Sequence, residues 1–297
     1  MERPYVVSAD VRLLLQNWAD QRGFKIPSTV FFDCMREKFS LRMQKIFPNF
    51  ELVPEKEIVD GLFKIVSESG LPPVSLDGVY FKSEMLFEIT RLVNRQGQNI
   101  GWGNRAGTLT IPQQLDLLRK TGVKKVALVD DVIFSGNMLE MILNLFSSIG
   151  IRVPVVCAGI GIAHGIKHIS NAKREIYCVR TFDQVIDEVC ERDFYPGAPL
   201  SGRLLSDGKN IGVPYIYPFG KFEDWASIPS EYGPDLSDFC LQQTTLLFEE
   251  IERISEKKVF CQDLGRKVIS LPTDNVRYVD ALCEARSRLV SRSRLVL

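Results

Sequence analysis

VALVDDVIFSGNML, residues 126–139, contains the strongest structural pattern in this chain. Its first four residues are apolar and do not alternate with polar ones, which is typical of a strand buried on both faces of a parallel sheet. Asp130 and Asp131 follow at the carboxyl end of this predicted strand, and Ser135 and Gly136 lead into an apolar helical pattern. The order of strand, short loop and helix predicts a ligand site, since open α/β sheets bind ligands at the carboxyl ends of their strands.

Short apolar runs and helical spacing alternate on both sides of this segment. We expect strands at 79–81, 99–102, 125–129, 154–162 and 176–179, and helices at 85–93, 112–120, 138–148, 164–171 and 183–190. Alternating units of this size predict a parallel sheet covered by helices on both faces. The predicted fold class is therefore α/β, with a mostly parallel, five-stranded, Rossmann-like sheet.

Helical patterns also occupy both ends of the chain, at 8–22, 31–46, 55–68, 236–254 and 274–290. Between the core and the last helices, the chain is rich in glycine, proline and aromatic residues, which predicts an irregular hood of ordered loops that cover part of the protein. We therefore expect a helical segment at 1–72 packed on the core, an α/β core at 73–182, and hood loops with carboxy-terminal helices at 183–297.

Composition excludes several classes of partner. Lys and Arg together number 37, as do Asp and Glu, so the chain has no general attraction for nucleic acid or an anionic membrane surface. The longest apolar run, 153–163, is too short to span a bilayer, and the amino terminus shows no secretory signal. The seven cysteines are scattered without a CxxC pair, so we expect reduced thiols and a cytoplasmic location.

The loop after the paired carboxylates has the residues that a phosphate site needs. Backbone amides at a helix start, together with the Ser135 hydroxyl, favour a phosphate monoester. Asp130 and Asp131 cannot hold that phosphate themselves, but they suit sugar hydroxyls or a Mg²⁺ ion that carries further phosphate. Together these features predict a site for a phosphorylated ribose next to a metal-bound anionic group.

VALVDDVIFSGNML resembles the ribose-phosphate signature of type I phosphoribosyltransferases, in which an apolar strand and two acidic residues precede a loop ending in Thr/Ser, Gly, any residue, Thr. In that family the acidic pair contacts the ribose hydroxyls of phosphoribosyl pyrophosphate (PRPP), and the loop wraps the 5′-phosphate. The resemblance implies that Asp130 and Asp131 contact the ribose and bind Mg²⁺. It implies a ribose-phosphate site made with them by Val132, Ile133, Phe134, Ser135, Gly136, Asn137 and Met138.

The resemblance extends to the order of elements from 74 to 179. The family has a pyrophosphate-binding loop after its first core strand, near 77–82 in this chain, and a mobile catalytic loop before the signature strand, near 103–110. It implies Asp77, Gly78, Lys82 and Arg105 as pyrophosphate ligands, with Arg105 catalytic beside the acidic pair.

The segment DFYPG, residues 193–197, is similar in type to the base-contacting hood segment of purine-salvage members. In those enzymes an aromatic side chain stacks on the base. The resemblance therefore implies base contacts from Asp193, Phe194 and Tyr195.

Two positions depart from the signature. Met138 stands where a threonine hydroxyl normally reaches the phosphate, and Phe134 stands where many members have a small hydroxyl residue. Loss of one hydroxyl contact to a phosphate weakens binding by about 1.5 to 3 kcal/mol, or roughly ten- to a hundredfold.

Two functions follow from the resemblance and its departures. The first is an enzyme that transfers phosphoribose to or from a nitrogenous base, with magnesium pyrophosphate as the leaving group. The second is a non-catalytic module that senses a nucleotide or PRPP and uses its helical ends to bind a protein or RNA partner. A homo-oligomer is compatible with either function.

Asp130 and Asp131 also have alternative interpretations. The two carboxylates could merely cap a strand and a turn. A haloacid-dehalogenase phosphatase needs a second aspartate two residues after the first, where this chain has Val132, and a response-regulator pocket needs further acidic residues and a lysine that we do not find clearly placed. A Rossmann dinucleotide site is not indicated, because GIGIAHG at 159–165 has the wrong glycine spacing.

Overall fold

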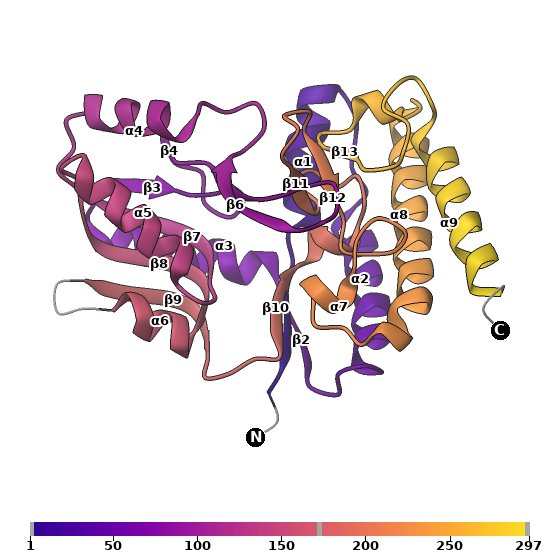
Figure 1. Ribbon diagram of the computed structural model, residues 1–297, viewed down its shortest axis with the longest axis horizontal. Helices are drawn as coiled ribbons and strands as arrows, with labels where there is room; N and C mark the ends of the chain where they lie inside the picture. The colour runs from indigo at the N-terminus through magenta and orange to yellow at the C-terminus, as the bar shows by residue number, and fades with distance from the viewer. Residues whose placement is uncertain (1–2, 171–173, 295–297) are drawn as a thin grey trace. The chain divides into compact units, whose positions relative to one another are not determined.

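The predicted strand at 125–129 lies in the middle of a parallel sheet in the computed structural model of the protein (Figure 1). The structure describes residues 3–170 and 174–294. Within these ranges, a five-stranded sheet has the order β4-β3-β7-β8-β9, and every adjacent pair runs parallel. Its strands are β3 (Pro73–Ser75), β4 (Met85–Leu86), β7 (Lys125–Ile133), β8 (Arg152–Ile162) and β9 (Glu175–Phe182). The predicted combination of helices with a mostly parallel sheet is confirmed.

Helices cover both faces of this sheet (Figure 1). A Cβ atom added at Gly159 of β8 would lie 2.6 Å from Ile58 Cγ2 of α3, whereas the preceding residue, Ala158, belongs to the same hydrophobic cluster as Leu139 and Ile142 of α5. Successive residues of a strand point to opposite faces, so α3 and α5 cover opposite faces. The helices here are α3 (Glu55–Ser69), α4 (Ile111–Lys120), α5 (Asn137–Ser148) and α6 (Ala163–Ile169).

The chain divides into two compact units. The sheet unit comprises Val53–Arg91 and Gly101–Val185, and the terminal unit comprises Met1–Leu52, Leu92–Ile100 and Ile186–Leu297. Two strands, β5 (Ile89–Val93) and β6 (Asn99–Asn104), carry the chain from one unit to the other and back.

The terminal unit has an aromatic-rich core, in which the Tyr5 and Phe47 rings stack with centroids 4.3 Å apart. Its main helices are α1 (Val11–Arg22), α2 (Thr29–Gln44), α8 (Gly233–Ser255) and α9 (Tyr278–Arg294), with a short α7 (Phe222–Trp225). A three-stranded sheet has the order β10-β1-β2, from β10 (Asp187–Cys190), β1 (Tyr5–Ser8) and β2 (Phe50–Val53). The strands β11 (Arg203–Leu205), β12 (Ile211–Val213) and β13 (Lys267–Val268) form a further sheet with β5 and β6.

Several local predictions are confirmed. Helices form at α4, α5, α8 and α9 close to the predicted bounds, and strands form at β6, β7, β8 and β9. The strand β6, predicted as part of the parallel sheet, belongs instead to the sheet that contains β5 and β11. The helix predicted at 164–171 corresponds to α6, although its last residue, Asn171, lies outside the described residues.

Other local predictions are wrong. Residues 85–93 form β4 and β5 instead of a helix, and 79–81 form part of the connection between β3 and β4. Residues 187–190, predicted as helical, form β10, which pairs in parallel with β1. Because β1 and β2 are also strands, the first seventy residues are only partly helical, and Ser8 ends β1 instead of capping α1, whose N-cap is Asp10. Short apolar segments fit either periodicity, so pairing with neighbouring strands decided their structure.

Candidate functional site

The central strand β7 is longer than predicted. It continues through both carboxylates to Ile133, and Asp130 is paired in register with Ala158 of β8. The extension occurs because β8 is itself long enough to supply partners up to Gly161. Only residues 134–136 therefore separate the strand from α5.

Asp130 is a buried carboxylate with one oxygen available. The residue is only 4% exposed, and its Oδ1 accepts a hydrogen bond from the Asp131 N–H at 3.0 Å. Its Oδ2 is also buried and has no hydrogen-bond partner among the described residues. Burial raises the pKa of Asp130 well above its usual range, and the negative charges of Asp131 and Asp77 raise it further. A buried carboxylate that lacks a partner is costly unless a ligand completes it.

Asp77 lies next to Asp130 at the same edge of the sheet. It follows β3, whose last residue, Ser75, is in register with Val129 of β7, and its negative charge acts on Asp130. Asp77 Oδ1 accepts a hydrogen bond from the Val79 N–H at 2.9 Å, which forms a tight turn after the strand. The structure thus brings Asp77 close to Asp130, and the role of Asp77 toward pyrophosphate stays a prediction.

The loop at 134–136 delivers the chain to the amino terminus of α5. Gly136, with φ of +81°, is the N-cap residue, and the Asn137 N–H donates to Ser135 Oγ at 3.4 Å. The first N–H groups of a helix have no acceptor within the helix and carry its positive dipole end. Residues 135–138 therefore provide donors for an anion, whereas Met138 contributes no hydroxyl.

Helix α6 packs directly against this loop, which the sequence analysis did not predict. A Cβ atom at Gly165 would lie 2.1 Å from the Phe134 carbonyl oxygen. The His164 ring meets the Phe134 ring edge to face, with centroids 5.7 Å apart, and His168 Nε2 lies 3.1 Å from Glu140 Oε2 in the first turn of α5. Both imidazoles of α6 thus face the loop and α5.

The three glycines of GIGIAHG are the sequence feature that makes this packing possible. A Cβ atom added at Gly159 would lie 2.6 Å from Ile58 Cγ2, and one added at Gly161 would lie 2.4 Å from Cys178 Sγ. All three glycines therefore allow close packing inside the sheet unit, and their spacing reflects contacts with neighbouring elements.

The remaining pyrophosphate candidates lie in two connections of the sheet unit. Lys82 is exposed between β3 and β4. Arg105 follows β6, and its backbone N–H donates to the Glu88 carbonyl oxygen at 3.4 Å. The loop of Arg105 is held by Thr108, whose Oγ1 donates to the Arg105 carbonyl oxygen at 2.8 Å. The roles of Lys82, Gly78 and Arg105 toward pyrophosphate stay predictions.

The base-binding candidates belong to the terminal unit. Phe194 and Tyr195 are fully buried in its hydrophobic core, where both rings lie near the Phe39 ring. Asp193 Oδ1 accepts a hydrogen bond from the Gly202 N–H at 2.7 Å, and burial raises the pKa of Asp193 although the charge of Arg192 lowers it. In this conformation the two rings offer no free face to a base, so base binding by these residues stays a prediction.

Among the described residues, no group of three or more His, Cys, Asp or Glu side chains is arranged to hold a metal ion. Magnesium in phosphate sites commonly takes only one or two carboxylates together with substrate phosphates and water. The donor chemistry of Asp130 and Asp131, with the unpartnered Asp130 Oδ2, fits that requirement. None of the described helices is long and apolar enough to cross a membrane, and all seven cysteines are free thiols.

Comparison with known proteins gives a slight structural likeness. An orotate phosphoribosyltransferase from Aeropyrum pernix has 13% sequence identity and a TM-score of 0.26, and the match covers 42% of this chain and 68% of that one. An adenine phosphoribosyltransferase from Thermoanaerobacter pseudethanolicus has 10% identity and a TM-score of 0.25, covering 41% and 79%. The adenine phosphoribosyltransferase from Rhodothermus marinus has 12% identity and a TM-score of 0.27, covering 42% and 77%.

These scores and identities are too low to define the family of this chain. No protein-family model matches the sequence, and no curated protein sequence matches it.

Proposed function

We propose that the sheet unit binds PRPP or a nucleotide 5′-phosphate and transfers phosphoribose to or from a nitrogenous base. The observation that carries this proposal is the buried Asp130 Oδ2 atom, which has no hydrogen-bond partner among the described residues. It lies on the central strand, four residues before the loop at 134–136 that leads into α5. A sugar hydroxyl donating to this oxygen would offset the cost of its burial.

The site separates its negative and positive groups in the way that a phosphorylated ribose requires. Asp130 and Asp131 would accept hydrogen bonds from the ribose 2′ and 3′ hydroxyls. The Ser135 hydroxyl and the amides at the start of α5 would hold the 5′-phosphate, which the negative carboxylates repel toward the helix. The two ends of the ligand are thus fixed from one segment of nine residues, 130–138.

The same carboxylates suit the chemistry of pentosyl transfer. A nitrogen nucleophile would displace pyrophosphate from C1 of the ribose through an oxocarbenium-like transition state, whose positive charge the carboxylates would stabilise. Asp130 and Asp131 would hold Mg²⁺ when it is bound, and Mg²⁺ would neutralise charge on the pyrophosphate. Asp77, Gly78, Lys82 and Arg105 would position the pyrophosphate itself.

Calorimetry of PRPP with Mg²⁺ tests the proposal. We expect micromolar binding to the native protein, weakened at least about tenfold by Asp131→Asn, since a hydrogen bond to a charged group contributes about 1.5 to 3 kcal/mol. The matched control is Asp33→Asn, which removes an exposed carboxylate from α2 and should leave binding unchanged. Absence of PRPP binding to the native protein would end the proposal.

Restoring the hydroxyl at position 138 should strengthen the site. Met138 is half-buried in the first turn of α5, and Met138→Thr would add one donor toward the phosphate. We expect PRPP to bind about tenfold more tightly in this variant, whereas the affinity for free ribose should not change. Equal PRPP affinities in the two proteins would show that the phosphate does not reach position 138.

The second candidate is a sensor that binds PRPP or a nucleotide without turnover, with the helical ends binding a protein or RNA partner. Met138 and the burial of Phe194 and Tyr195 favour it, because they remove one phosphate contact and the proposed base-stacking surface. Release of pyrophosphate from PRPP in the presence of a panel of bases separates the two functions. Turnover with any base excludes a pure sensor.

A further inference from the structure

A pocket of the terminal unit lies between helices α2 and α8. Its volume is about 380 Å³, which is in the range of small-molecule sites. Phe31 and Met35 line it from α2, and Leu246 lines it from α8. Met35 is buried, Phe31 is partly buried, and Leu246 is 42% exposed. The two helices thus give the pocket apolar walls on both sides.

A buried polar side chain of the pocket wall has no hydrogen-bond partner among the described residues. Gln243 of α8 is only 5% exposed, and its amide forms no hydrogen bond with any residue in 3–170 or 174–294. The amide oxygen and nitrogen are nevertheless not sealed from solvent. Because the pocket is the open space that Gln243 lines, the amide faces into it.

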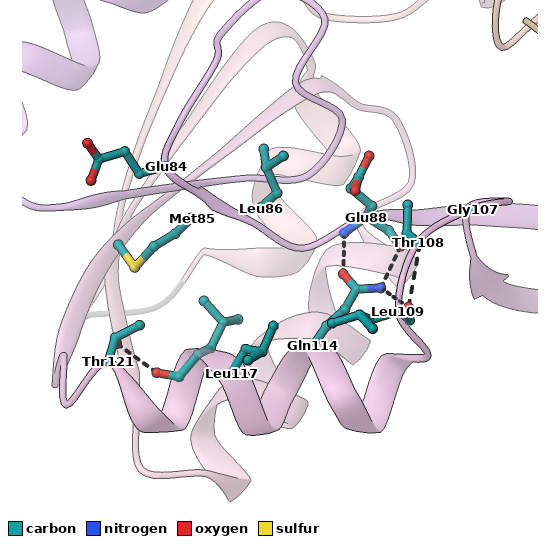
Figure 2. A pocket seen from close by; sticks show the side chains of 11 residues that line it. Glu84, Met85, Leu86, Glu88, Gly107, Thr108, Leu109, Gln114, Leu117 and Thr121 are labelled. Carbon is teal, nitrogen blue, oxygen red and sulfur yellow. Dashed lines mark hydrogen bonds between the residues drawn. The ribbon is translucent and has the colours of Figure 1, made fainter.

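Gln114 shows what such an amide does when the protein itself satisfies it. Gln114 is 6% exposed and lines a pocket beside α4 in the sheet unit (Figure 2). Its amide accepts from the Glu88 N–H at 2.7 Å and donates to the carbonyl oxygens of Glu88 and Leu109 at 3.2 and 2.7 Å. Gln243 is buried to the same degree without a hydrogen bond to the described residues. Since an unpaired buried amide is costly, this difference indicates that a ligand completes Gln243.

The charged side chains around the pocket balance one another. Lys38 of α2 and Arg253 of α8 carry positive charges, and Glu249 and Glu250 of α8 carry negative ones. Arg253 also neutralises Glu250 directly, through two hydrogen bonds of 2.6 and 2.7 Å. This rim of four side chains has no net charge, so it favours a neutral ligand over an anion or a cation.

The amide and the apolar walls together define the chemistry of the ligand. Gln243 offers an acceptor oxygen and two N–H donors, so a ligand with a donor and an acceptor on one edge can pair with both groups. A hydrocarbon would leave the amide unpaired, and a fatty acid would bring an uncompensated charge and no donor. A flat heterocycle also suits the ring of Phe31 and the thioether of Met35, because both make favourable contacts with aromatic rings.

We propose that this pocket binds a neutral, planar nitrogen heterocycle of the nucleobase type. The ring lies between the walls from α2 and α8, and one of its edges forms two hydrogen bonds with the Gln243 amide, as glutamine does with adenine. The inference does not rest on the ribose-phosphate site, because it uses none of residues 130–138 and requires neither PRPP nor Mg²⁺.

Calorimetry of the full chain with adenine, in the absence of PRPP and Mg²⁺, tests the proposal. We expect one adenine per chain, with affinity about tenfold lower in Gln243→Leu. The adenine analogue 6-dimethylaminopurine lacks the donor hydrogens and should also bind about tenfold more weakly. The matched control is Gln242→Leu, which changes the preceding, exposed glutamine of α8 outside the pocket and should leave the affinity unchanged. Asp131→Asn should leave it unchanged as well, because the sheet unit takes no part.

Cys34 provides a second measurement, on the native protein. Its thiol is exposed and lines the pocket, whereas the thiol of Cys283 is exposed and does not line it. Bound adenine should slow the alkylation of Cys34 by N-ethylmaleimide in proportion to the occupancy that calorimetry gives, and the alkylation of Cys283 should not change. This measurement decides the question even if Gln243→Leu does not fold.

The outcomes that overturn the proposal are distinct. Absence of adenine binding overturns it outright. Unchanged adenine affinity in Gln243→Leu, or equal affinity for 6-dimethylaminopurine, overturns the pairing with the amide and with it the choice of ligand. Equal protection of Cys34 and Cys283, or loss of adenine binding in Asp131→Asn but not in Gln243→Leu, places the adenine outside this pocket.

Discussion

The variant Asp130→Asn is expected to be more stable than the native protein and to lose PRPP binding. Asparagine keeps the acceptor for the Asp131 N–H, since its Oδ1 can replace that of Asp130. It removes a carboxyl group whose ionised form is disfavoured by burial and by the negative charges of Asp131 and Asp77, and its amide can donate toward those carboxylates. We expect a gain of about 1 to 3 kcal/mol in the free energy of unfolding, or a rise of several degrees in the unfolding temperature.

The pH dependence has a defined sign. The pKa of Asp130 is raised in the folded protein, so folding favours its neutral form. Its contribution is fully present below the ordinary aspartate pKa of the unfolded chain and is lost as pH rises through the folded value. The native protein should therefore lose stability with rising pH above the usual aspartate range, relative to Asp130→Asn. Urea unfolding of both proteins at a series of pH values measures the difference.

Asp10 of the terminal unit provides the matched control. It is also a fully buried aspartate, and burial raises its pKa to about 8 although the charge of Arg192 lowers it. The difference from Asp130 is that Asp10 Oδ2 accepts a hydrogen bond, from Arg192 Nη1 at 2.6 Å. In Asp10→Asn the side-chain NH₂ group can face the guanidinium of Arg192, and because both groups are hydrogen-bond donors, the bond is lost. This variant should therefore lose about 3 kcal/mol of stability and keep its PRPP affinity. If Asp130→Asn is destabilised in the same way, Asp130 has a structural role and the proposed ribose contact is wrong.

The contrast between segments 126–139 and 79–93 shows what the sequence can specify. The central strand and α5 were predictable because an unbroken apolar run and a regular helical spacing each fit one structure. Helix α4 was predictable for a similar reason, since Pro112 stands in its first turn and Thr110 with Gln113 forms a capping box. In 85–93 the apolar spacing fits a helix, but pairing with β3 and β11 makes the segment two strands. That pairing involves residues distant in sequence, so local pattern could not reveal it.

The candidate site was predictable in its residues but not in its surroundings. The acidic pair and the Ser-Gly loop could be identified because their order along the chain is local. The burial of Phe194 and Tyr195 depends on contacts with α2, and the contact between α6 and the loop depends on glycines 29 residues apart, Gly136 and Gly165. In both cases the contacting residue comes from a distant part of the chain. The aromatic and glycine patterns therefore did not reveal what 193–197 and 159–165 contact.

The variant Gly165→Ala should displace the phosphate loop. Alanine normally favours a helix over glycine by about 1 kcal/mol, but here its Cβ atom would lie 2.1 Å from the Phe134 carbonyl oxygen, so α6 and the loop must move apart. We expect a net loss of about 1 to 3 kcal/mol in the free energy of unfolding. Because the amides of residues 135–138 would move with the loop, PRPP affinity should fall at least about tenfold.

The control for Gly165→Ala is a glycine in the same unit that lacks this contact. Gly150 has φ of +79° after α5, and no heavy atom lies within 4 Å of an added Cβ. Gly150→Ala should lose about 1 to 2 kcal/mol through backbone strain alone and keep native PRPP affinity. Urea unfolding measures the stability of Gly165→Ala and Gly150→Ala, and calorimetry measures their PRPP affinity. The two variants are expected to have similar stability and to differ in whether the new Cβ atom meets the phosphate loop. If Gly165→Ala binds PRPP as tightly as Gly150→Ala does, α6 supports folding without positioning the phosphate donors, and residues 135–138 cannot be the phosphate site.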